Sequence, residues 1–294
     1  MKAVFLDWAT MGPDLDISAL RALLPRLEIF DESTSEEVAE RIAGAAIVLG
    51  NKVLISESLF DAAPEMRFIG LTATGTDNVN LRAARDRGVA VANIRAYCTA
   101  SVVEHVFGSI LNLAHNLTNY GKDVRGGAWQ NATIFTLLTR PISELAGKTL
   151  GIIGYGELGR GVAGVAAAFG MEVIVAARPG THQIPEGRVA FNELLERADF
   201  ISLHCPLTDA TRGLFGADQF RAMKKTAILV NTARGALIDS QALAGALQDG
   251  EIAAAAIDVL PKEPPVDGDP LLDYAGDNLI VTPHIAWATL EARQ

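Results

Sequence analysis

Three side chains that can do chemistry follow short apolar runs in the C-terminal half of the sequence: Arg234, Glu263 and His284. We expect each run to be a strand, and because parallel strands end at one edge of a sheet, the three side chains should converge there. The planar fork of an arginine can hold a carboxylate and polarise a neighbouring carbonyl. A histidine can give a proton to the carbonyl oxygen near neutral pH, and a carboxylate can orient the imidazole and favour its charged form. The combination suits the reversible reduction of a 2-oxo acid.

Each of these residues also has an ordinary structural explanation. Arg234 could cap a helix or form a surface ion pair, Glu263 could be a solvated loop residue, and His284 could satisfy a backbone carbonyl. Taken one at a time, these explanations are preferred. Three such residues at successive strand ends, downstream of a nucleotide-binding pattern, favour chemistry.

The nucleotide-binding pattern is Gly154-Tyr-Gly156-Glu-Leu-Gly159. A buried strand is expected at 150–153 before it, and a small-residue helix at 160–169 and a second strand at 173–176 after it. In such a unit Gly154 allows the tight turn, Gly156 lets a pyrophosphate approach the backbone, and Gly159 lets helix and strand pack closely. The glycines alone are weak evidence, but their place between strand and helix predicts a dinucleotide site.

The elements that must position these residues alternate regularly along the chain. In the first part, strands are expected at 3–6, 27–30, 46–49, 68–72 and 89–92, and helices at 17–24, 34–44 and 80–88. Thr34 followed by Glu37 predicts a capping box at the start of the second of these helices. Repeated strand–helix units predict a parallel sheet whose ligand loops follow the carboxyl ends of its strands.

The second part begins with one long helix at 99–119, which we expect to bridge two domains. After the glycine unit, helices are expected at 191–197, 217–223 and 240–248, and strands at 200–203, 227–230, 254–257 and 279–281. The sequence therefore predicts an α/β protein with two doubly wound parallel-sheet domains.

Residues 126–141 are irregular and apolar for a surface loop, and they include Trp129 and Phe135. We expect this segment to be covered, either by a second subunit or by packing on its own chain.

The bulk composition restricts the class of partner. The chain has 294 residues and a formal net charge of -10, without a cluster of Lys and Arg, so nucleic acid is an unfavourable ligand. No apolar stretch predicts a signal sequence or a membrane span, and Cys98 and Cys205 are too far apart to indicate a metal cluster or a disulfide framework. The default location is the cytoplasm.

The sequence resembles the D-isomer-specific 2-hydroxyacid dehydrogenase family, and within it the glycerate dehydrogenase/hydroxypyruvate reductase branch. The likeness covers nearly the whole chain, and its motifs are specific in combination. The matching stretches are 154–159, 204–208 (His-Cys-Pro-Leu-Thr), 230–235 (Val-Asn-Thr-Ala-Arg-Gly), 258–265 and 283–289 (Pro-His-Ile-Ala-Trp-Ala-Thr).

The resemblance implies a Rossmann cofactor domain at 99–286 inserted in a flavodoxin-like substrate domain at 1–98, to which 287–294 return. It implies hinges near Cys98 and Trp287, and a cleft that closes over the bound reactants. It also implies a homodimer and no metal.

The resemblance further implies reduction of hydroxypyruvate and glyoxylate to D-glycerate and glycolate, with His284 as the proton donor. The implied catalytic residues are Arg234, Glu263 and His284. Thr74 and Gly75, with Arg234 and His284, would bind the substrate, whereas Lys52 could lie near it or be solvated. The implied cofactor-binding residues are Gly154, Gly156, Glu157, Leu158, Gly159, Arg178, His204, Cys205, Pro206, Thr232, Ala233 and Asp258, with Asp258 meeting the nicotinamide carboxamide.

Two departures from the family pattern lead to further expectations. Many members carry an acidic residue after the second strand of the cofactor domain, where this chain has Ala177 followed by Arg178. Arg178 could pair with a 2'-phosphate, so we expect NADP(H) to be preferred, with NAD(H) possible; the alternative is an arginine that merely faces water. Family members also continue past residue 293 with a helix, so we expect an incomplete sequence or a missing helix, and lower stability.

Two other functions stay open at this point. The same fold family resembles transcriptional corepressors that sense NAD(P)(H) without turnover, although the Arg, Glu and His positions favour an enzyme. A Rossmann methyltransferase is also conceivable, but it leaves the arrangement of Arg234, Glu263 and His284 unexplained. The particular 2-oxo acid is beyond the sequence, because one methylene changes discrimination by only ~1–3 kcal/mol.

Overall fold

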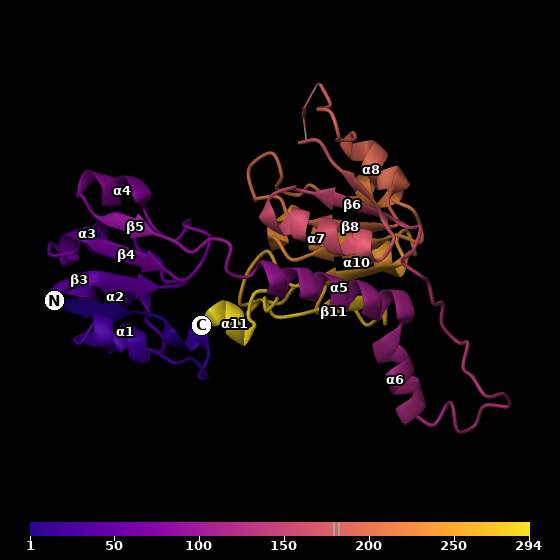
Figure 1. Cartoon of the computed structure of the whole chain (residues 1–294), viewed down its shortest axis with the longest axis horizontal. Helices are drawn as coiled ribbons and strands as arrows, with labels where there is room; N and C mark the ends of the chain where they lie inside the picture. Colours follow the sequence, from indigo (N-terminus) through magenta and orange to yellow (C-terminus); the bar gives the residue numbers. More distant parts are fainter. Residues whose placement is uncertain (179, 182) are drawn as a thin grey trace. The chain divides into compact units, whose positions relative to one another are not determined.

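The computed structural model describes residues 1–178, 180–181 and 183–294, and the chain forms two compact units. The first unit contains residues 1–97 and 289–294, and the second contains residues 98–288. Each unit has its own parallel sheet with helices around it (Figure 1). The predicted fold class, α/β with two parallel-sheet domains, is confirmed.

The first unit is built on a five-stranded sheet in the order β2-β1-β3-β4-β5. Its strands are β1 (Lys2–Phe5), β2 (Leu27–Ile29), β3 (Ala45–Gly50), β4 (Phe68–Leu71) and β5 (Ala90–Ala92). Its helices are α1 (Ser18–Leu23), α2 (Ser35–Ile42), α3 (Glu57–Ala62), α4 (Leu81–Asp86) and α11 (Leu290–Arg293), with a 3-10 turn at Trp8–Met11. This is the flavodoxin-like strand order, in which the chain reverses direction across the sheet beside β1.

Local signals start the helices of this unit where expected. Helix α2 opens with the predicted capping box, in which the Thr34 N–H donates to the Glu37 carboxylate at 2.9 Å. Its apolar residues Val38 and Ile42 are buried against the sheet. Helix α3 was not expected from the sequence, although Ser56 precedes it as the N-cap residue and Phe60 anchors it in the core.

The second unit is built on a six-stranded sheet in the order β11-β10-β9-β8-β6-β7. Its strands are β6 (Thr149–Ile153), β7 (Glu172–Val175), β8 (Phe200–Leu203), β9 (Ile228–Asn231), β10 (Ala254–Ile257) and β11 (Leu279–Val281). Beyond β7, Val189 forms a parallel bridge with Ala176. When this bridge is counted as a strand, the order is that of a dinucleotide-binding sheet, 3-2-1-4-5-6 from its edge.

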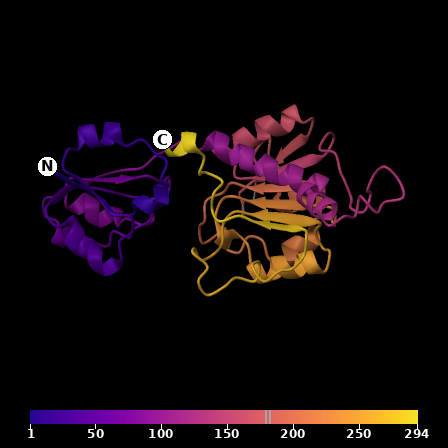
Figure 2. The ribbon, with the colours of Figure 1, turned by 90° about the horizontal axis from the view of Figure 1, so that it is seen from below.

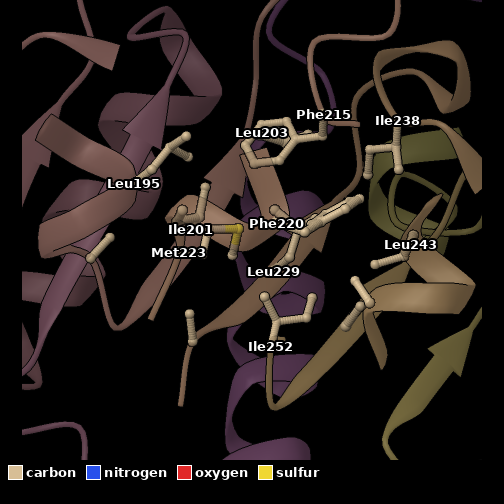
Figure 3. Close-up of a cluster of buried hydrophobic side chains, with 14 of the residues drawn as sticks. Leu195, Ile201, Leu203, Phe215, Phe220, Met223, Leu229, Ile238, Leu243 and Ile252 are labelled. Atoms are coloured by element: carbon tan, nitrogen blue, oxygen red, sulfur yellow. The ribbon is translucent and has the colours of Figure 1, made fainter. Parts of the chain in front are cut away.

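Helices cover both faces of this sheet (Figure 2). The helices of this unit are α5 (Thr99–His115), α6 (Leu117–Arg125), α7 (Glu157–Ala168), α8 (Phe191–Arg197), α9 (Ala217–Ala222) and α10 (Ser240–Gln248), with a 3-10 turn at Gly235–Leu237. Helix α6 points away from the sheet (Figure 1). Helices α5 and α7 share one apolar core with the sheet. Helices α8, α9 and α10 share the other, in which Phe215, Phe220 and Leu229 are fully buried (Figure 3). The strands are apolar on both sides because both faces are covered.

The long helix expected at 99–119 is interrupted, so that prediction is wrong in its extent. Asn116 has a left-handed backbone with φ of 53°, which ends α5 and begins α6. Its side-chain Nδ2 donates to the Pro141 carbonyl at 2.8 Å, and Asn112 Oδ1 accepts from the N–H of Thr118 at 2.9 Å. Asparagine tolerates this conformation, and the pattern of apolar residues alone does not reveal it.

The apolar segment at 126–141 is largely left uncovered by the described residues of the second unit. Figure 1 shows it extending away from the rest of the second unit after α6. Phe135 is 90% exposed, Leu138 is 76% exposed and Ile134 is 61% exposed. At its base, Arg140 holds Asp123 through two hydrogen bonds of 3.0 and 3.2 Å. Of the two covers expected from the sequence, packing on the described residues of the second unit is therefore not observed, and cover by a second subunit stays a prediction.

No helix in the described ranges combines the length and the apolar character needed to cross a membrane.

Candidate active site

The glycine turn after β6 has the geometry of a dinucleotide site. Gly154 has φ of 96°, and a Cβ atom there would lie 2.4 Å from the backbone of His204 and Cys205. A Cβ at Gly159 would lie 2.2 Å from the Gly154 carbonyl oxygen. No atom of the described residues lies within 4 Å of the Cβ position of Gly156, which leaves room for a ligand at the start of α7. The three glycines therefore serve a tight turn, a close helix–strand contact and an open approach, as a pyrophosphate requires.

The N-terminus of α7 faces this opening without a side-chain cap. Gly156 is the N-cap residue, and no side chain among the described residues caps the helix. Glu157 has its carboxylate engaged by the Thr99 hydroxyl, and Leu158 packs against the core beneath. Because the first N–H groups of a helix attract anions, the α7 N-terminus suits the phosphates of a dinucleotide.

Two buried polar atoms follow the neighbouring strands β8 and β9. The Nε2 atom of His204 lies 2.9 Å from the Ser202 hydroxyl, whereas Nδ1 is withdrawn from solvent with no hydrogen-bond partner in the described part of the chain. The hydroxyl of Thr232 is likewise buried without a partner there. Unpaired buried polar atoms are costly, so their presence fits a bound group that completes them.

The protonation states of His204 and Cys205, which follow β8, are set by burial. Burial lowers the pKa of His204 to about 4, so its imidazole is neutral near pH 7. Burial raises the pKa of Cys205 to about 11, which keeps the thiol protonated and unreactive. Pro206 accepts a hydrogen bond from the Thr211 hydroxyl at 2.8 Å, which fixes the loop after β8. The side chains of His204 and Cys205 are therefore uncharged near neutral pH.

His284 and Glu263 are in direct contact. The Nδ1 atom of His284 lies 2.6 Å from Glu263 Oε2, and the other carboxylate oxygen accepts the Leu260 N–H at 2.8 Å. The backbone of His284 is left-handed, with φ of 57°, and its N–H donates to the Asp258 carbonyl at 2.8 Å. The carboxylate therefore fixes one ring nitrogen and leaves Nε2 as the atom that can exchange a proton with a substrate.

Asp258 fixes the loop that carries His284. Its buried carboxylate accepts the Thr282 hydroxyl at 2.6 Å and the N–H groups of Ile285 and Ala286 at 2.9 Å. The Thr282 hydroxyl also lies 3.2 Å from Nε2 of His105, a residue of α5. Asp258 thus acts as an anchor, and its contact with a nicotinamide carboxamide stays a prediction.

Arg234 is exposed on the loop after β9, and its Nη1 donates to the Ala233 carbonyl at 2.7 Å. Asn231 locks this loop by accepting the Ala233 N–H and donating to the Arg234 carbonyl, both at 3.0 Å. A Cβ at Gly235 would lie 2.0 Å from the Leu260 backbone. The loop of Arg234 therefore lies directly against the stretch that leads to Glu263.

The structural partners of the site were missed in the sequence. Asn231 and Gly235 stand beside Arg234 in the motif at 230–235, so the close approach of two loops could have been inferred from the glycine. His105 lies on a helix far away in the sequence, and no local pattern indicates its contact with Thr282.

Ala177 and Arg178 lie at the end of β7, as counted from the sequence. The N–H of Ala177 donates to the Val189 carbonyl at 2.8 Å, and Ala177 is buried while Arg178 is exposed. No carboxylate occupies this position, where an adenosine ribose lies in dinucleotide-binding sheets.

The first unit carries the remaining predicted residues. Thr74 and Gly75 lie in the loop after β4, where Asn93 Nδ2 donates to the Thr74 carbonyl at 2.7 Å. Their own backbone N–H groups have no acceptor among the described residues. Lys52 has an exposed side chain, and its N–H donates to the buried carboxylate of Asp7 at 2.6 Å.

Comparison with known proteins identifies the chain. A family model described as D-isomer specific 2-hydroxyacid dehydrogenase, NAD binding domain, matches residues 107–286. The chain, over its full length, is 44% identical to a glycerate dehydrogenase of Methylorubrum extorquens and covers 91% of it. It is 37% identical to a hydroxypyruvate reductase of Blautia hydrogenotrophica, again over its full length, and covers 92% of that protein. The structure of an acyclic imino acid reductase in complex with NADPH and D-Arg matches all of this chain over 92% of its own length, with a TM-score of 0.84 and 27% identity.

The chain therefore belongs to the D-isomer specific 2-hydroxyacid dehydrogenase family. It is an NAD(P)-dependent oxidoreductase that acts on the CH–OH group of D-2-hydroxy acids. The resemblance drawn from the sequence and the prediction of an enzyme are confirmed, and the methyltransferase alternative is wrong.

Proposed function

We propose that this enzyme reduces hydroxypyruvate to D-glycerate and glyoxylate to glycolate, with NADPH as the preferred coenzyme. The observation that carries the proposal is the 2.6 Å contact between His284 and Glu263 at the carboxyl edge of a dinucleotide-binding sheet. The glycerate dehydrogenase and hydroxypyruvate reductase relatives support this choice of substrate.

In the proposed reaction, His284 supplies the proton. When bound, the reduced coenzyme supplies a hydride to the keto carbon. His284 Nε2 gives its proton to the keto oxygen, and Glu263 stabilises the charge that the imidazole carries before transfer. The C=O bond becomes a CH–OH group, and the histidine regains a proton from solvent. Because Glu263 is itself held by the Leu260 N–H, the ring keeps one orientation throughout.

The proposed role of Arg234 is to hold the substrate carboxylate and polarise the adjacent carbonyl. The locked loop at 231–235 presents this guanidinium from the exposed side of the sheet edge. The backbone N–H groups of Thr74 and Gly75 are proposed as further donors to the carboxylate. We accordingly assign substrate binding to residues 1–98 and 287–294, and coenzyme binding to residues 99–286.

The proposed coenzyme site uses the glycine turn and the ends of β8 and β9. The N–H groups of Glu157 and Leu158 would meet the pyrophosphate, and residues 204–206 would line the groove. Thr232 and Ala233 would lie beside the nicotinamide, together with Asp258. Arg178, without a neighbouring carboxylate, would pair with a 2'-phosphate, and this supports NADPH over NADH.

A second copy of the chain is proposed as the cover of residues 126–141. This segment is apolar and exposed, and the ion pairs of Arg140 fix its base. The conformational entropy lost when another surface covers it is therefore small. Sedimentation of the purified protein should give a dimer, and Phe135→Asp with Leu138→Asp should give monomers. A monomeric wild-type enzyme would contradict this part of the proposal.

Steady-state kinetics with both coenzymes and a panel of small 2-oxo acids tests the proposed function. We expect the highest kcat/KM for hydroxypyruvate, followed by glyoxylate, and a higher value with NADPH than with NADH. A higher kcat/KM with NADH would refute the coenzyme assignment, and a larger value with pyruvate would refute the substrate assignment.

A further inference from the structure

Arg188 lies over the aromatic ring of Tyr155. The guanidinium carbon is 5.0 Å from the ring centroid, a cation–π distance. Tyr155 stands between Gly154 and Gly156 in the glycine turn, and 36% of it is exposed. Arg188 comes from a segment that lies more than thirty positions later in the sequence. The stack therefore ties this segment to the glycine turn.

The backbone places Arg188 next to the end of β7. Val189 donates its N–H to the Val175 carbonyl at 2.9 Å, and its carbonyl accepts the Ala177 N–H at 2.8 Å. Arg188 directly precedes Val189, and Arg178 directly follows Ala177. Two arginines therefore flank one pair of hydrogen-bonded strands, on the side of the sheet where the adenosine ribose of a dinucleotide lies.

The positive charge of Arg188 is not neutralised by a carboxylate among the described residues. Its side chain has no ion pair and no hydrogen bond there, whereas Arg41, Arg87, Arg140, Arg197, Arg221 and Arg293 are all paired with carboxylates. Stacking occupies the face of a guanidinium and leaves its in-plane N–H groups able to bind an anion. In a chain with a net charge of -10, an arginine held in this way marks a place for an anion.

We propose that Arg188, held by Tyr155, is a second specificity residue for the 2'-phosphate of NADPH and acts together with Arg178. This inference rests on the proposed preference for NADPH. The pyrophosphate is the less suitable anion, because the N-terminus of α7 already supplies N–H groups for it, whereas the backbone beside Arg188 is bonded to the end of β7, where the adenosine ribose lies. The 2'-phosphate is present only in NADPH, so the assignment separates the two coenzymes.

Equilibrium binding tests the assignment without turnover. Calorimetry gives the Kd of the wild-type enzyme for NADPH and NADH, and for the fragments 2',5'-ADP and 5'-AMP, which lack the nicotinamide. The variants are Arg188→Ala, Arg188→Lys and Tyr155→Leu. Arg82→Ala is the matched control, because it removes the same charge from an exposed position on α4 of the first unit. Thermal melts show that each variant is folded.

We expect Arg188→Ala to weaken the binding of NADPH and of 2',5'-ADP by about tenfold, the loss of one charge-assisted contact, and to change NADH and 5'-AMP by less than about twofold. Arg188→Lys should fall between wild type and Arg188→Ala, because lysine keeps the charge but loses the planar fork. Tyr155→Leu should weaken 2',5'-ADP more than 5'-AMP, and Arg82→Ala should change neither.

Four results would overturn the assignment. Equal weakening of NADPH and NADH in Arg188→Ala would mean that Arg188 contacts a part common to both. An unchanged Kd for every ligand would mean that the guanidinium only covers the ring. If the wild-type enzyme prefers NADPH and Arg188→Ala keeps the full preference, only the role of Arg188 is refuted. If the wild-type enzyme binds NADH as tightly as NADPH, the proposed coenzyme preference is refuted as well.

Discussion

The first strands of the two sheets end in opposite ways. In the first unit β1 leads to Asp7, whose buried carboxylate accepts the N–H groups of Asn51, Lys52 and Val53 at 2.6 to 3.1 Å. In the second unit β6 leads to the glycine turn, and in the part of the chain that the structure describes nothing lies within 4 Å of the Cβ position of Gly156. Both sheets are parallel and both reverse direction beside this strand.

The difference shows how one architecture yields two kinds of edge. Backbone N–H groups gather where parallel strands end and helices begin, and they attract negative charge. The first sheet supplies that charge from its own chain, so Asp7 fixes the loop of Lys52 in place. The second sheet leaves the place open, so an external phosphate can enter. The shared fold therefore does not define the function, and the residues after the first strand decide whether this edge is closed by its own chain or open to a ligand.

His284 is the proposed proton donor at the open edge, so replacing this residue should produce the largest effect. We expect His284→Ala to lower kcat by about 10²–10⁴-fold, the usual contribution of a positioned proton donor, with little change in the Kd for NADPH. His115→Ala, on the last turn of α5, is the matched control and should retain wild-type kcat. Turnover near the wild-type value in His284→Ala would exclude it as the acid.

At the edge of the first sheet, where Asp7 occupies the strand end, a substitution should lower the stability of the fold rather than the rate of the reaction. We expect Asp7→Ala to lower the free energy of unfolding by about 3 kcal/mol, because the N–H groups of residues 51–53 lose their acceptor. Urea denaturation measures this, with the exposed Asp31→Ala as a control expected within about 0.5 kcal/mol of wild type. A change in Asp7→Ala as small as in the control would show that the carboxylate does not hold the loop.

His204 should make the stability of the enzyme depend on pH. Its pKa is lowered to about 4 in the folded state, from an ordinary value of 6.5. At a pH between these two values the imidazole is protonated in the unfolded chain and neutral in the folded protein. Stability should therefore fall as the pH drops from 6.5 toward 4, by about 2–3 kcal/mol on this account, and be unaffected above 6.5.

Urea denaturation isolates the contribution of His204 to the pH dependence of stability. It compares wild type with His204→Gln at neutral pH and at about pH 4.5, since the two proteins share all other titrating groups. The glutamine variant should lose less stability than wild type over this interval. An identical loss in both proteins would mean that the imidazole is not kept neutral by burial.

Closing the opening at Gly156 should give the smallest change. Gly156 has φ of -77°, which alanine adopts readily, so Gly156→Ala should fold normally while the Kd for NADPH rises by about tenfold. Gly164→Ala on the same helix adds a methyl group into equally open space and should leave the Kd unchanged. If both substitutions bind NADPH as wild type does, the pyrophosphate does not approach this glycine.

Regular parts of the molecule could be predicted from the sequence because they depend on local patterns. The strands, the capping box of α2 and the glycine turn follow from residues within a few positions of one another. Arg234, Glu263 and His284 could be grouped because each follows a strand. The break at Asn116 depends on contacts with Pro141, and the stack of Arg188 on Tyr155 joins residues far apart in the sequence, so neither leaves a local pattern.

The central claim is that the open edge of the second sheet binds a reduced nicotinamide coenzyme and passes its hydride to a 2-oxo acid. Rapid mixing of the NADPH-loaded enzyme with hydroxypyruvate tests it directly. The account predicts that the absorbance of the reduced nicotinamide disappears and that D-glycerate forms in equal amount. Bound NADPH whose absorbance stays constant with hydroxypyruvate, glyoxylate and pyruvate alike, or formation of the L-enantiomer of glycerate, would contradict it.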